Sequence, residues 1–279
     1  MTIRELLKRT TARLDAAGVP NADYDAAVML AHVLGEDALM LRMNSWKDMP
    51  AQKLESYEAI IARREMREPM QYILGSTGFM GLDFHVAPGV LIPRPDTEIL
   101  CEEALRRLSP GMRVLDIGTG SGALAVSIAA HRKDCIVTAV DISDDALAIA
   151  RGNAERNGAQ VRFIKSDCFA ALEGEVFDMI VSNPPYINSE EMAQLMDEVR
   201  CEPELALFGG EDGLDFYRRI SREADAYLAD GGCLLFEIGW QQKDAVSALL
   251  REHIGDPFAL RDYGGNWRVV GAAKTKQEV

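Results

Sequence analysis

The sequence has no long hydrophobic run. Its longest apolar stretches, such as residues 122–130, fall well short of the roughly 20 residues that a membrane-spanning helix needs. The first ten residues, MTIRELLKRT, contain neither an apolar signal core nor a small-residue cleavage site. We therefore expect a soluble, cytoplasmic protein.

Cysteine and histidine are scarce and carry no ligand spacing. The cysteine count is odd and no CxxC pair occurs, which speaks against a disulfide framework and against structural zinc. The sequence predicts no metal site and buried thiols in a reducing compartment. The residues concerned are Cys101, Cys135, Cys168, Cys201 and Cys233, with His32, His85, His131 and His253.

A basic excess is also missing. The chain of 279 residues carries 30 Lys and Arg against 44 Asp and Glu, a net charge of −14. Proteins that bind nucleic acid or anionic membranes through phosphate contacts normally carry basic patches, so this balance argues against both. Residues 1–86 carry 10 basic and 12 acidic side chains and residues 87–279 carry 20 and 32, giving net charges of −2 and −12. Most of the net negative charge therefore lies in residues 87–279.

What is present is the composition of a globular protein, with 48% hydrophobic and 27% charged residues, in a chain longer than one average domain. Residues 1–70 show helical periodicity, which begins at a Thr2–Glu5 capping box, and Gly35 is a plausible end of the second helix. Short β-type runs punctuated by glycine predict a β-hairpin linker over 71–92. Residues 93–279 form the third and largest part.

In that third part, strands alternate with helices after a helix that ends near Leu108. The strand candidates are RVLDIG, CIVTAVD, VRFIKS, FDMIVS, GCLLFEIG and WRVVGAA. This alternation predicts an α/β fold with a mostly parallel sheet covered on both faces, in which ligands bind beyond the carboxyl ends of the strands.

A glycine-rich turn, Asp116-Ile117-Gly118-Thr119-Gly120-Ser121-Gly122, connects the first of these strands to a helix. Glycine there lets the backbone approach a ligand closely, but the pattern also satisfies a relaxed dinucleotide fingerprint, so the cofactor stays open. Asp141 ends the next strand, where a carboxylate can bind ribose hydroxyls; a helix cap is the alternative, and Ser143 serves that role equally well. Asp167 and Cys168 end the following strand, where an adenine edge would lie, unless they form a simple surface turn.

The fourth strand runs into Asn183-Pro184-Pro185-Tyr186. Two prolines remove two backbone donors and stiffen the exit from the strand, which leaves the Asn183 side chain and the Asn183 and Pro184 carbonyls as exposed acceptors. An amide, rigid carbonyls and an aromatic ring in this order favour a binding function over a turn.

With these motifs the chain resembles the S-adenosylmethionine-dependent methyltransferases that modify planar amino or amide nitrogens. Further segments, at residues 75–100, 201–220 and 236–242, are similar to those of the peptide chain release factor glutamine methyltransferases, and the likeness covers essentially the whole chain. The resemblance implies a Rossmann-like class I methyltransferase fold with a seven-stranded sheet. It also implies a helical substrate-recognition domain over 1–70 and a catalytic domain over 93–279.

The implied reaction is methylation of the side-chain amide nitrogen (N5) of the glutamine in the Gly-Gly-Gln motif of release factors. The resemblance assigns catalytic roles to Asn183, Pro184 and Tyr186, and it assigns substrate binding to these three residues and Pro185. It assigns S-adenosylmethionine to Gly118, Thr119, Gly120, Ser121, Gly122, Asp141, Asp167, Cys168, Phe169 and Asn183. Cys168 stands where relatives often carry a bulky aromatic residue, for which the adjacent Phe169 is a candidate substitute. Glu202 and Glu237 belong to family segments but receive no chemical role.

Other functions share parts of this pattern. A glutamine of a ribosomal protein is the nearest alternative target, and the amino group of adenine in nucleic acid is a second, although the acidic catalytic part disfavours a polyanion. A binding module without catalysis is disfavoured because the glycines, Asp141 and Asn183 are all present, and a nicotinamide dehydrogenase would leave the NPPY sequence without a role. We therefore expect a monomer that acts on release factors, without nucleic-acid or membrane binding.

Overall fold

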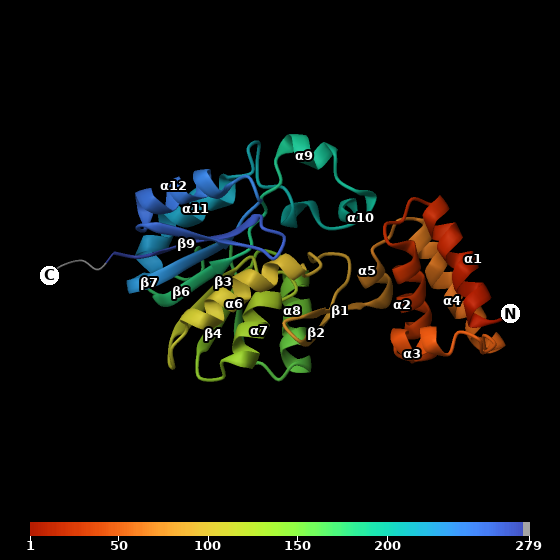
Figure 1. The fold of residues 1–279 in the computed structure, drawn as a ribbon. Coiled ribbons are helices and arrows are strands. Elements are labelled where there is room, and N and C mark those ends of the chain that lie inside the picture. The colour runs from red at the N-terminus through yellow and green to blue at the C-terminus, as the bar shows by residue number, and fades with distance from the viewer. Residues whose placement is uncertain (276–279) are drawn as a thin grey trace. The chain divides into compact units, whose positions relative to one another are not determined.

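The computed structural model describes residues 1–275 and divides into two compact units (Figure 1). The smaller unit comprises Met1–Ser76 together with Met196–Cys201, and the larger comprises Thr77–Leu195 and Glu202 onward. The segment 196–201 follows the NPPY sequence in the chain but packs with the first unit. The boundaries predicted from the sequence follow chain order and therefore did not assign residues 196–201 to the helical unit.

The smaller unit is helical. Its helices are α1 (Ile3–Ala16), α2 (Ala22–Leu34), α3 (Ala38–Met43), α4 (Ala51–Glu65), α5 (Met70–Leu74) and α10 (Asp197–Arg200). The capping box of Thr2 and Glu5 is confirmed, as is the left-handed Gly35 at the end of α2. Buried apolar side chains, among them Leu6, Leu30 and Tyr57, form a separate core. The short helices α3 and α5 were not predicted, and α5 occupies the beginning of the predicted linker.

A buried ion cluster holds α10 in this unit. The Arg64 guanidinium on α4 donates to Asp25 of α2 at 2.8 Å and to Glu198 of α10 at 2.9 Å. Arg67 adds two hydrogen bonds to Glu198, at 2.6 and 2.7 Å. Each charge is matched by a partner, as buried ionic groups require.

The predicted hairpin is formed by β1 (Ser76–Phe79) and β2 (Leu82–His85). It packs against α8 (Asp144–Arg156), whose buried Asn153 accepts from the His85 N–H at 2.7 Å and donates to the His85 carbonyl at 2.9 Å. The Asn153 amide also donates to the Ser121 carbonyl at 2.8 Å, which joins the hairpin to the glycine-rich turn.

The larger unit contains the expected seven-stranded sheet, ordered β5-β4-β3-β6-β7-β9-β8. The first five of these strands are parallel, and β9 runs antiparallel to both of its neighbours. The bounds are β3 Arg113–Ile117, β4 Ile136–Asp141, β5 Val161–Lys165, β6 Phe177–Ser182, β7 Leu228–Glu237, β8 Pro257–Arg261 and β9 Trp267–Ala273. The sequence predicted all of these except β8. The expected α/β class is confirmed.

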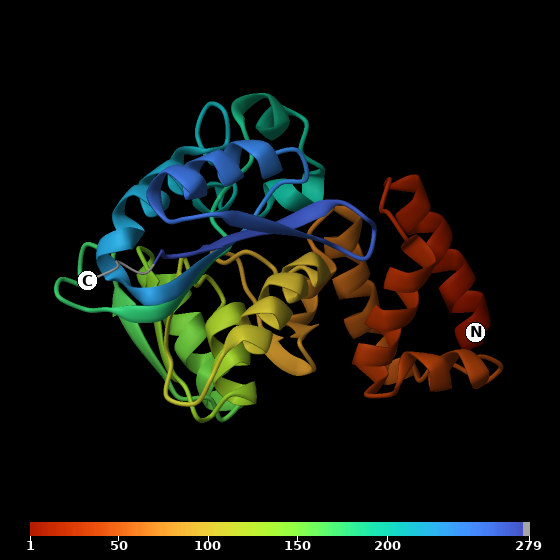
Figure 2. The same ribbon diagram turned by 60° about the vertical axis from the view of Figure 1, so that its left-hand side comes forward.

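Helices cover both faces of this sheet (Figures 1 and 2). On one side lie α6 (Glu98–Arg107), α7 (Ala123–His131) and α8, and on the other α11 (Asp215–Ala224) and α12 (Lys243–His253). Successive strand residues alternate between the two cores, so that Val114 joins one and Leu115 the other. The short α9 (Ser189–Ala193) follows the NPPY sequence. Within residues 1–275, no helix is long and apolar enough to cross a membrane.

The cysteines depart in part from the prediction of buried thiols. Cys101, Cys168 and Cys233 are buried, and burial raises the pKa of Cys168 and Cys233 to about 11. Cys135 is partly exposed and Cys201, on the surface, is exposed. The expectation of burial is therefore wrong for Cys201.

Candidate active site

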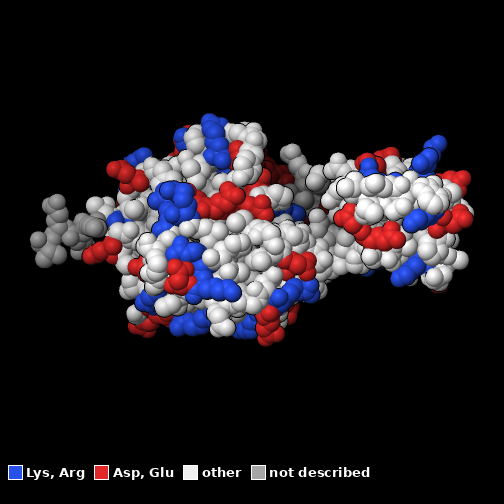
Figure 3. All heavy atoms as spheres, turned by 60° about the horizontal axis from the view of Figure 1, so that its bottom comes forward, with Lys and Arg blue, Asp and Glu red and all other residues white. Residues whose placement is uncertain are grey.

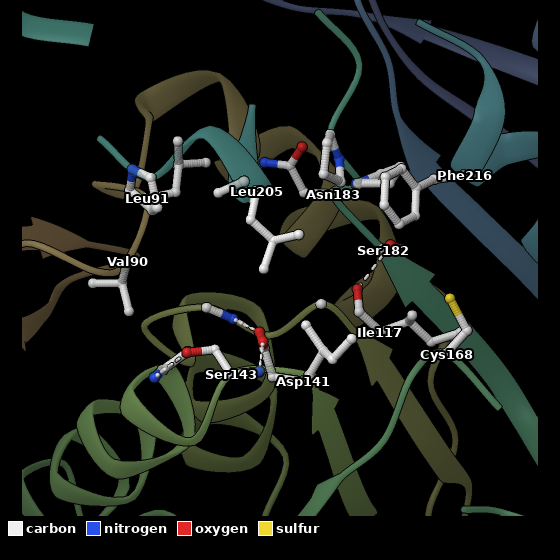
Figure 4. A pocket seen from close by; sticks show the side chains of 18 of the residues that line it. Val90, Leu91, Ile117, Asp141, Ser143, Cys168, Ser182, Asn183, Leu205 and Phe216 are labelled. Carbon is white, nitrogen blue, oxygen red and sulfur yellow. Dashed lines mark hydrogen bonds between the residues drawn. The ribbon is translucent and has the colours of Figure 1, made fainter. Parts of the chain in front are cut away.

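A cavity of about 300 Å³ lies in the larger unit at the carboxyl ends of β3, β4 and β6. In the sheet order β3 and β6 are neighbours, and the chain runs outward from β3 to β4 and β5 on one side and from β6 to β7 on the other; α/β folds bind their ligands at such a reversal of strand order. In Figure 4, Asp141 and Asn183 lie on opposite walls and Leu205 points into the space between them. Val90 and Leu91, from the loop that follows the hairpin, form a further wall.

The glycine-rich turn faces this cavity with two of its glycines. Gly118 and Gly120 have φ angles of +73° and +55°, which favour glycine, and a Cβ on either would enter open space beside the cavity. Gly122, with a φ of +84°, has a further reason to be glycine, since a Cβ there would lie 3.1 Å from the Ala150 and Val126 side chains. Two glycines thus admit a ligand, and the third admits close helix packing.

The side chains of Thr119 and Ser121 are buried and are not among the residues that line the cavity. The Thr119 hydroxyl donates to Asp116 at 2.7 Å, and the Ala125 N–H at the start of α7 donates to the same carboxylate at 3.3 Å. Burial raises the pKa of Asp116 to about 7. Asp116 and Thr119 therefore fix the shape of the turn from beneath it.

The Asp141 carboxylate, at the end of β4, accepts two backbone hydrogen bonds and also lines the cavity. One carboxylate oxygen accepts from the Gly120 N–H at 2.8 Å, and the other accepts from the Ser143 N–H at 2.9 Å. Ser143 itself caps α8 by accepting from the Ala146 N–H. Because a carboxylate can accept about four hydrogen bonds, Asp141 keeps capacity toward the cavity that it lines. Ser143 thus provides the helix cap, and Asp141 keeps acceptor capacity on the side of the cavity.

Of the residues predicted after β5, Asp167 and Cys168 line the cavity and Phe169 does not. Cys168 lines the cavity, whereas the Phe169 ring is buried and stacks on Tyr227 at 4.4 Å between centroids. The Asp167 carboxylate is half exposed and pairs with Arg219 at 2.6 Å. Asp167 is part of the cavity lining, with its carboxylate held by that arginine.

The apolar wall comes from residues that the sequence did not single out. Ile142, Leu205 and Phe216 line the cavity, and Ile142 and Leu205 are 47% and 58% exposed. Ile142 directly follows a strand-ending acid, which is the one signal that would have revealed it. Leu205 and Phe216 come from segments far along the chain, so no local pattern marks them.

The NPPY sequence begins at the adjacent strand end. The Asn183 side-chain nitrogen donates to the Thr97 hydroxyl at 3.3 Å, while Asn183, Pro184 and Pro185 line the cavity. The Tyr186 carbonyl accepts from the Gln242 amide at 3.0 Å, which fixes the backbone after the prolines. Burial raises the pKa of the Tyr186 hydroxyl, so this ring is neutral at physiological pH.

Glu202 ties together two loops around the cavity. It is buried, accepts from the Ile92 N–H at 3.0 Å and pairs with Arg94. Ile92 follows Val90 and Leu91 directly, and Glu202 precedes the cavity residue Pro203. Glu202 therefore acts on the walls and not as a group within the cavity.

These residues suit S-adenosylmethionine, the cofactor that the resemblance implies. Open space above Gly118 and Gly120 admits its chain, the Asp141 carboxylate offers acceptors for ribose hydroxyls, and Ile142, Leu205 and Phe216 offer apolar surface for a base. Carbonyl and carboxylate oxygens around the cavity also favour a cation.

Comparison with known proteins agrees with this geometry. A family model described as the methyltransferase small domain matches residues 95–266, and one described as the PrmC N-terminal domain matches residues 5–75. The chain is 45% identical to the release factor glutamine methyltransferase of Geobacter sulfurreducens over 97% of this chain and 96% of that one. It is 37% identical to the protein of the same name from Escherichia coli K12, over 97% and 98%.

Solved structures show the same fold. A 16S rRNA N2 G1207 methyltransferase of T. thermophilus, solved with AdoMet and guanosine, is 25% identical with a TM-score of 0.53, covering 71% of this chain and 49% of that chain. A methyltransferase from Pyrococcus furiosus gives a TM-score of 0.56 at 23% identity, covering 79% and 99%. The chain is thus an S-adenosylmethionine-dependent methyltransferase, and it belongs to the release factor glutamine methyltransferase family.

Proposed function

We propose that this enzyme methylates the side-chain amide nitrogen of the glutamine in the Gly-Gly-Gln motif of peptide chain release factors. The observation that carries the proposal is the Asn183 amide at the cavity wall. Its nitrogen donates a hydrogen bond to the Thr97 hydroxyl, and its oxygen is the atom that can accept a hydrogen bond from a substrate. The names of the curated relatives support the same substrate.

The target dictates what the site must do. The lone pair of an amide nitrogen is delocalised into the carbonyl, so the nitrogen is a poor nucleophile, and ordinary side-chain bases do not deprotonate it. Hydrogen bonds from its two N–H groups to fixed acceptors stabilise the partial positive charge that develops during methyl transfer. The Asn183 side-chain oxygen and the Pro184 carbonyl are the two acceptors in this proposal.

Rigidity makes these acceptors effective. The two prolines restrict the backbone, and Gln242 holds the Tyr186 carbonyl at 3.0 Å and the Gly213 carbonyl at 3.1 Å. S-adenosylmethionine supplies an activated methyl group on a cationic sulfur. Holding the amide in line with that group can lower the barrier by roughly 7–11 kcal/mol at most. Tyr186 stays our prediction for the ring that stacks on the amide plane.

We further propose that the enzyme acts as a cytoplasmic monomer on a protein substrate, without binding nucleic acid, and that the helical unit contributes to substrate recognition. On the face drawn in Figure 3, basic and acidic side chains are interspersed. The net charge of −14 supports a protein partner over a polyanion.

The test is a parallel labelling experiment. The enzyme is incubated with S-adenosylmethionine labelled in its methyl group in three separate reactions, which contain release factor, total ribosomal proteins or tRNA. We expect label on the release factor alone. Label on a ribosomal protein or on tRNA, with none on release factor, would overturn the proposal.

A further inference from the structure

Glu237 is a buried carboxylate beside the active site to which the proposed reaction gives no role. It ends β7, is 1% exposed, and its Oε2 atom has no hydrogen-bond partner within residues 1–275. Burying a carboxylate is costly unless partner charges and hydrogen bonds compensate it. In the parallel pair of β6 and β7, Ser182 lies opposite Phe236, so Asn183 and Glu237 are the next residues in register.

Thr97 connects these two side chains. It ends the 3-10 turn Pro95–Thr97, is 4% exposed, and its hydroxyl oxygen accepts from the Asn183 amide nitrogen at 3.3 Å. The same hydroxyl lies close to the Glu237 carboxylate and favours its ionised form, which opposes the effect of burial on the pKa of Glu237. A hydroxyl has a single proton, so when Thr97 donates that proton to Glu237 it can only accept from Asn183.

We propose that Glu237, acting through the Thr97 hydroxyl, is a positioning residue that sets which end of the Asn183 amide faces the substrate. The ionised carboxylate only accepts hydrogen bonds, which fixes the direction of the chain from Asn183 nitrogen to Thr97 to Glu237. The Asn183 oxygen is then turned toward the substrate amide, where an acceptor is required. The inference rests on the proposed function, because a substrate that offered an acceptor would need the opposite orientation.

The reverse arrangement shows why the charge matters. A protonated Glu237 would donate to Thr97, whose own proton would then be available to the Asn183 oxygen and would turn the amide around. Burial raises the pKa of Glu237 to about 7; Thr97, Arg268 and Arg94 oppose this rise and Asp96 adds to it. Tyr186 and Tyr217 also face the carboxylate, and both hydroxyls are neutral at this pH. Protonation of Glu237 therefore falls within a range in which the enzyme can be assayed.

The first test compares Thr97→Val with Thr97→Ser. Valine has nearly the same shape without the hydroxyl, whereas serine keeps the hydroxyl. We expect Thr97→Val to lower kcat on release factor about 10- to 100-fold, as losses of outer-shell partners do, with little change in KM, and Thr97→Ser to stay near wild type. Equal loss in both variants, or none in either, would overturn the inference.

Two further readouts separate positioning from other effects. Thermal melting checks that Thr97→Val is folded, and calorimetric titration with S-adenosylhomocysteine measures its cofactor site. We expect an unchanged affinity, since Thr97 is not among the residues that line the cavity. A loss of affinity as large as the loss of kcat would assign Thr97 to the cofactor and would contradict the proposal.

The second test is the pH profile. In wild type, kcat should fall as the pH decreases through about 7, because Glu237 becomes protonated. In Glu237→Gln the side chain offers Thr97 either a donor or an acceptor, so kcat should be lower at pH 8 and should not vary from pH 6 to 8. A Glu237→Gln enzyme with the wild-type profile would exclude Glu237 from this role. If wild type failed to methylate release factor at all, the proposed function would fail instead.

Discussion

At the residue scale, the site is built from a few atoms whose other bonds are already made. The Asp141 carboxylate accepts hydrogen bonds from the Gly120 and Ser143 N–H groups, and the Asn183 side-chain nitrogen donates a hydrogen bond to Thr97. The remaining acceptor capacity of Asp141 and the side-chain oxygen of Asn183 are left for the cavity that both residues line. This division could not be predicted from the sequence, because it depends on neighbours that are more than 80 positions away in the case of Asn183 and Thr97.

Replacing Asn183 by alanine tests the acceptor role. We expect Asn183→Ala to lower the rate of methyl transfer about 10²- to 10³-fold, as loss of one oriented transition-state group does. Single-turnover assays with release factor measure this rate, and calorimetry with S-adenosylhomocysteine should give an affinity that is much less affected. A rate near that of wild type would contradict the mechanism.

Asp141 should control cofactor affinity. Asp141→Ala removes hydrogen bonds to a charged group, each worth about 1.5–3 kcal/mol, so we expect Kd for S-adenosylmethionine to rise about 10- to 100-fold. Asp145→Ala is the matched control, because Asp145 is an exposed acid in the first turn of α8. Equal effects of the two substitutions on Kd would remove Asp141 from the cofactor site.

At the element scale, the sequence predicted the elements that carry strong local signals. The strands β3, β4 and β6 end at Ile117, Asp141 and Ser182, close to where their motifs begin, because buried parallel strands are continuous apolar runs. β8 was missed because Pro257–Arg261 begins with proline and contains alanine, two residue types that are depleted in strands. The apolar cavity wall was missed because Leu205 and Phe216 reach it through tertiary packing.

The four-residue helix α10 is a further element without a local signal, and it depends on Glu198. Burial opposes ionisation of Glu198, but hydrogen bonds from Arg67 and Arg64 outweigh it and hold the pKa at about 2, below the ordinary 4.5. A lowered pKa adds stability that is present above pH 4.5 and is lost as the pH falls toward 2. The size of this contribution is about 3 kcal/mol.

Glu198→Gln should therefore lower the free energy of unfolding at pH 7 by about 3 kcal/mol and flatten its decline below pH 4.5. Urea denaturation at several pH values gives both quantities. Glu190→Gln, at an exposed position on α9, is the control and should behave as wild type. If Glu198→Gln unfolded with the wild-type pH dependence, the ion cluster would not hold α10.

At the scale of the whole molecule, charge separates candidate substrates that share the NPPY chemistry. The larger part carries most of the net −14, which suits a cationic cofactor and disfavours a polyanion. We expect an excess of tRNA to leave the initial rate of release-factor methylation unchanged at low salt, where phosphate contacts are strongest. Light scattering of the same sample should give 30.7 kDa, the mass of one chain. Inhibition by tRNA that salt relieves would show that the enzyme binds nucleic acid.

Mass spectrometry of the methylated release factor decides the proposed reaction. The factor is methylated to completion, digested, and the peptide that contains Gly-Gly-Gln is fragmented. We expect the mass of one methyl group on the glutamine side chain, absent when the enzyme carries Asn183→Ala and is assayed over the same time. A methyl group on any other residue, or an unmodified Gly-Gly-Gln peptide after complete reaction, would contradict the proposal.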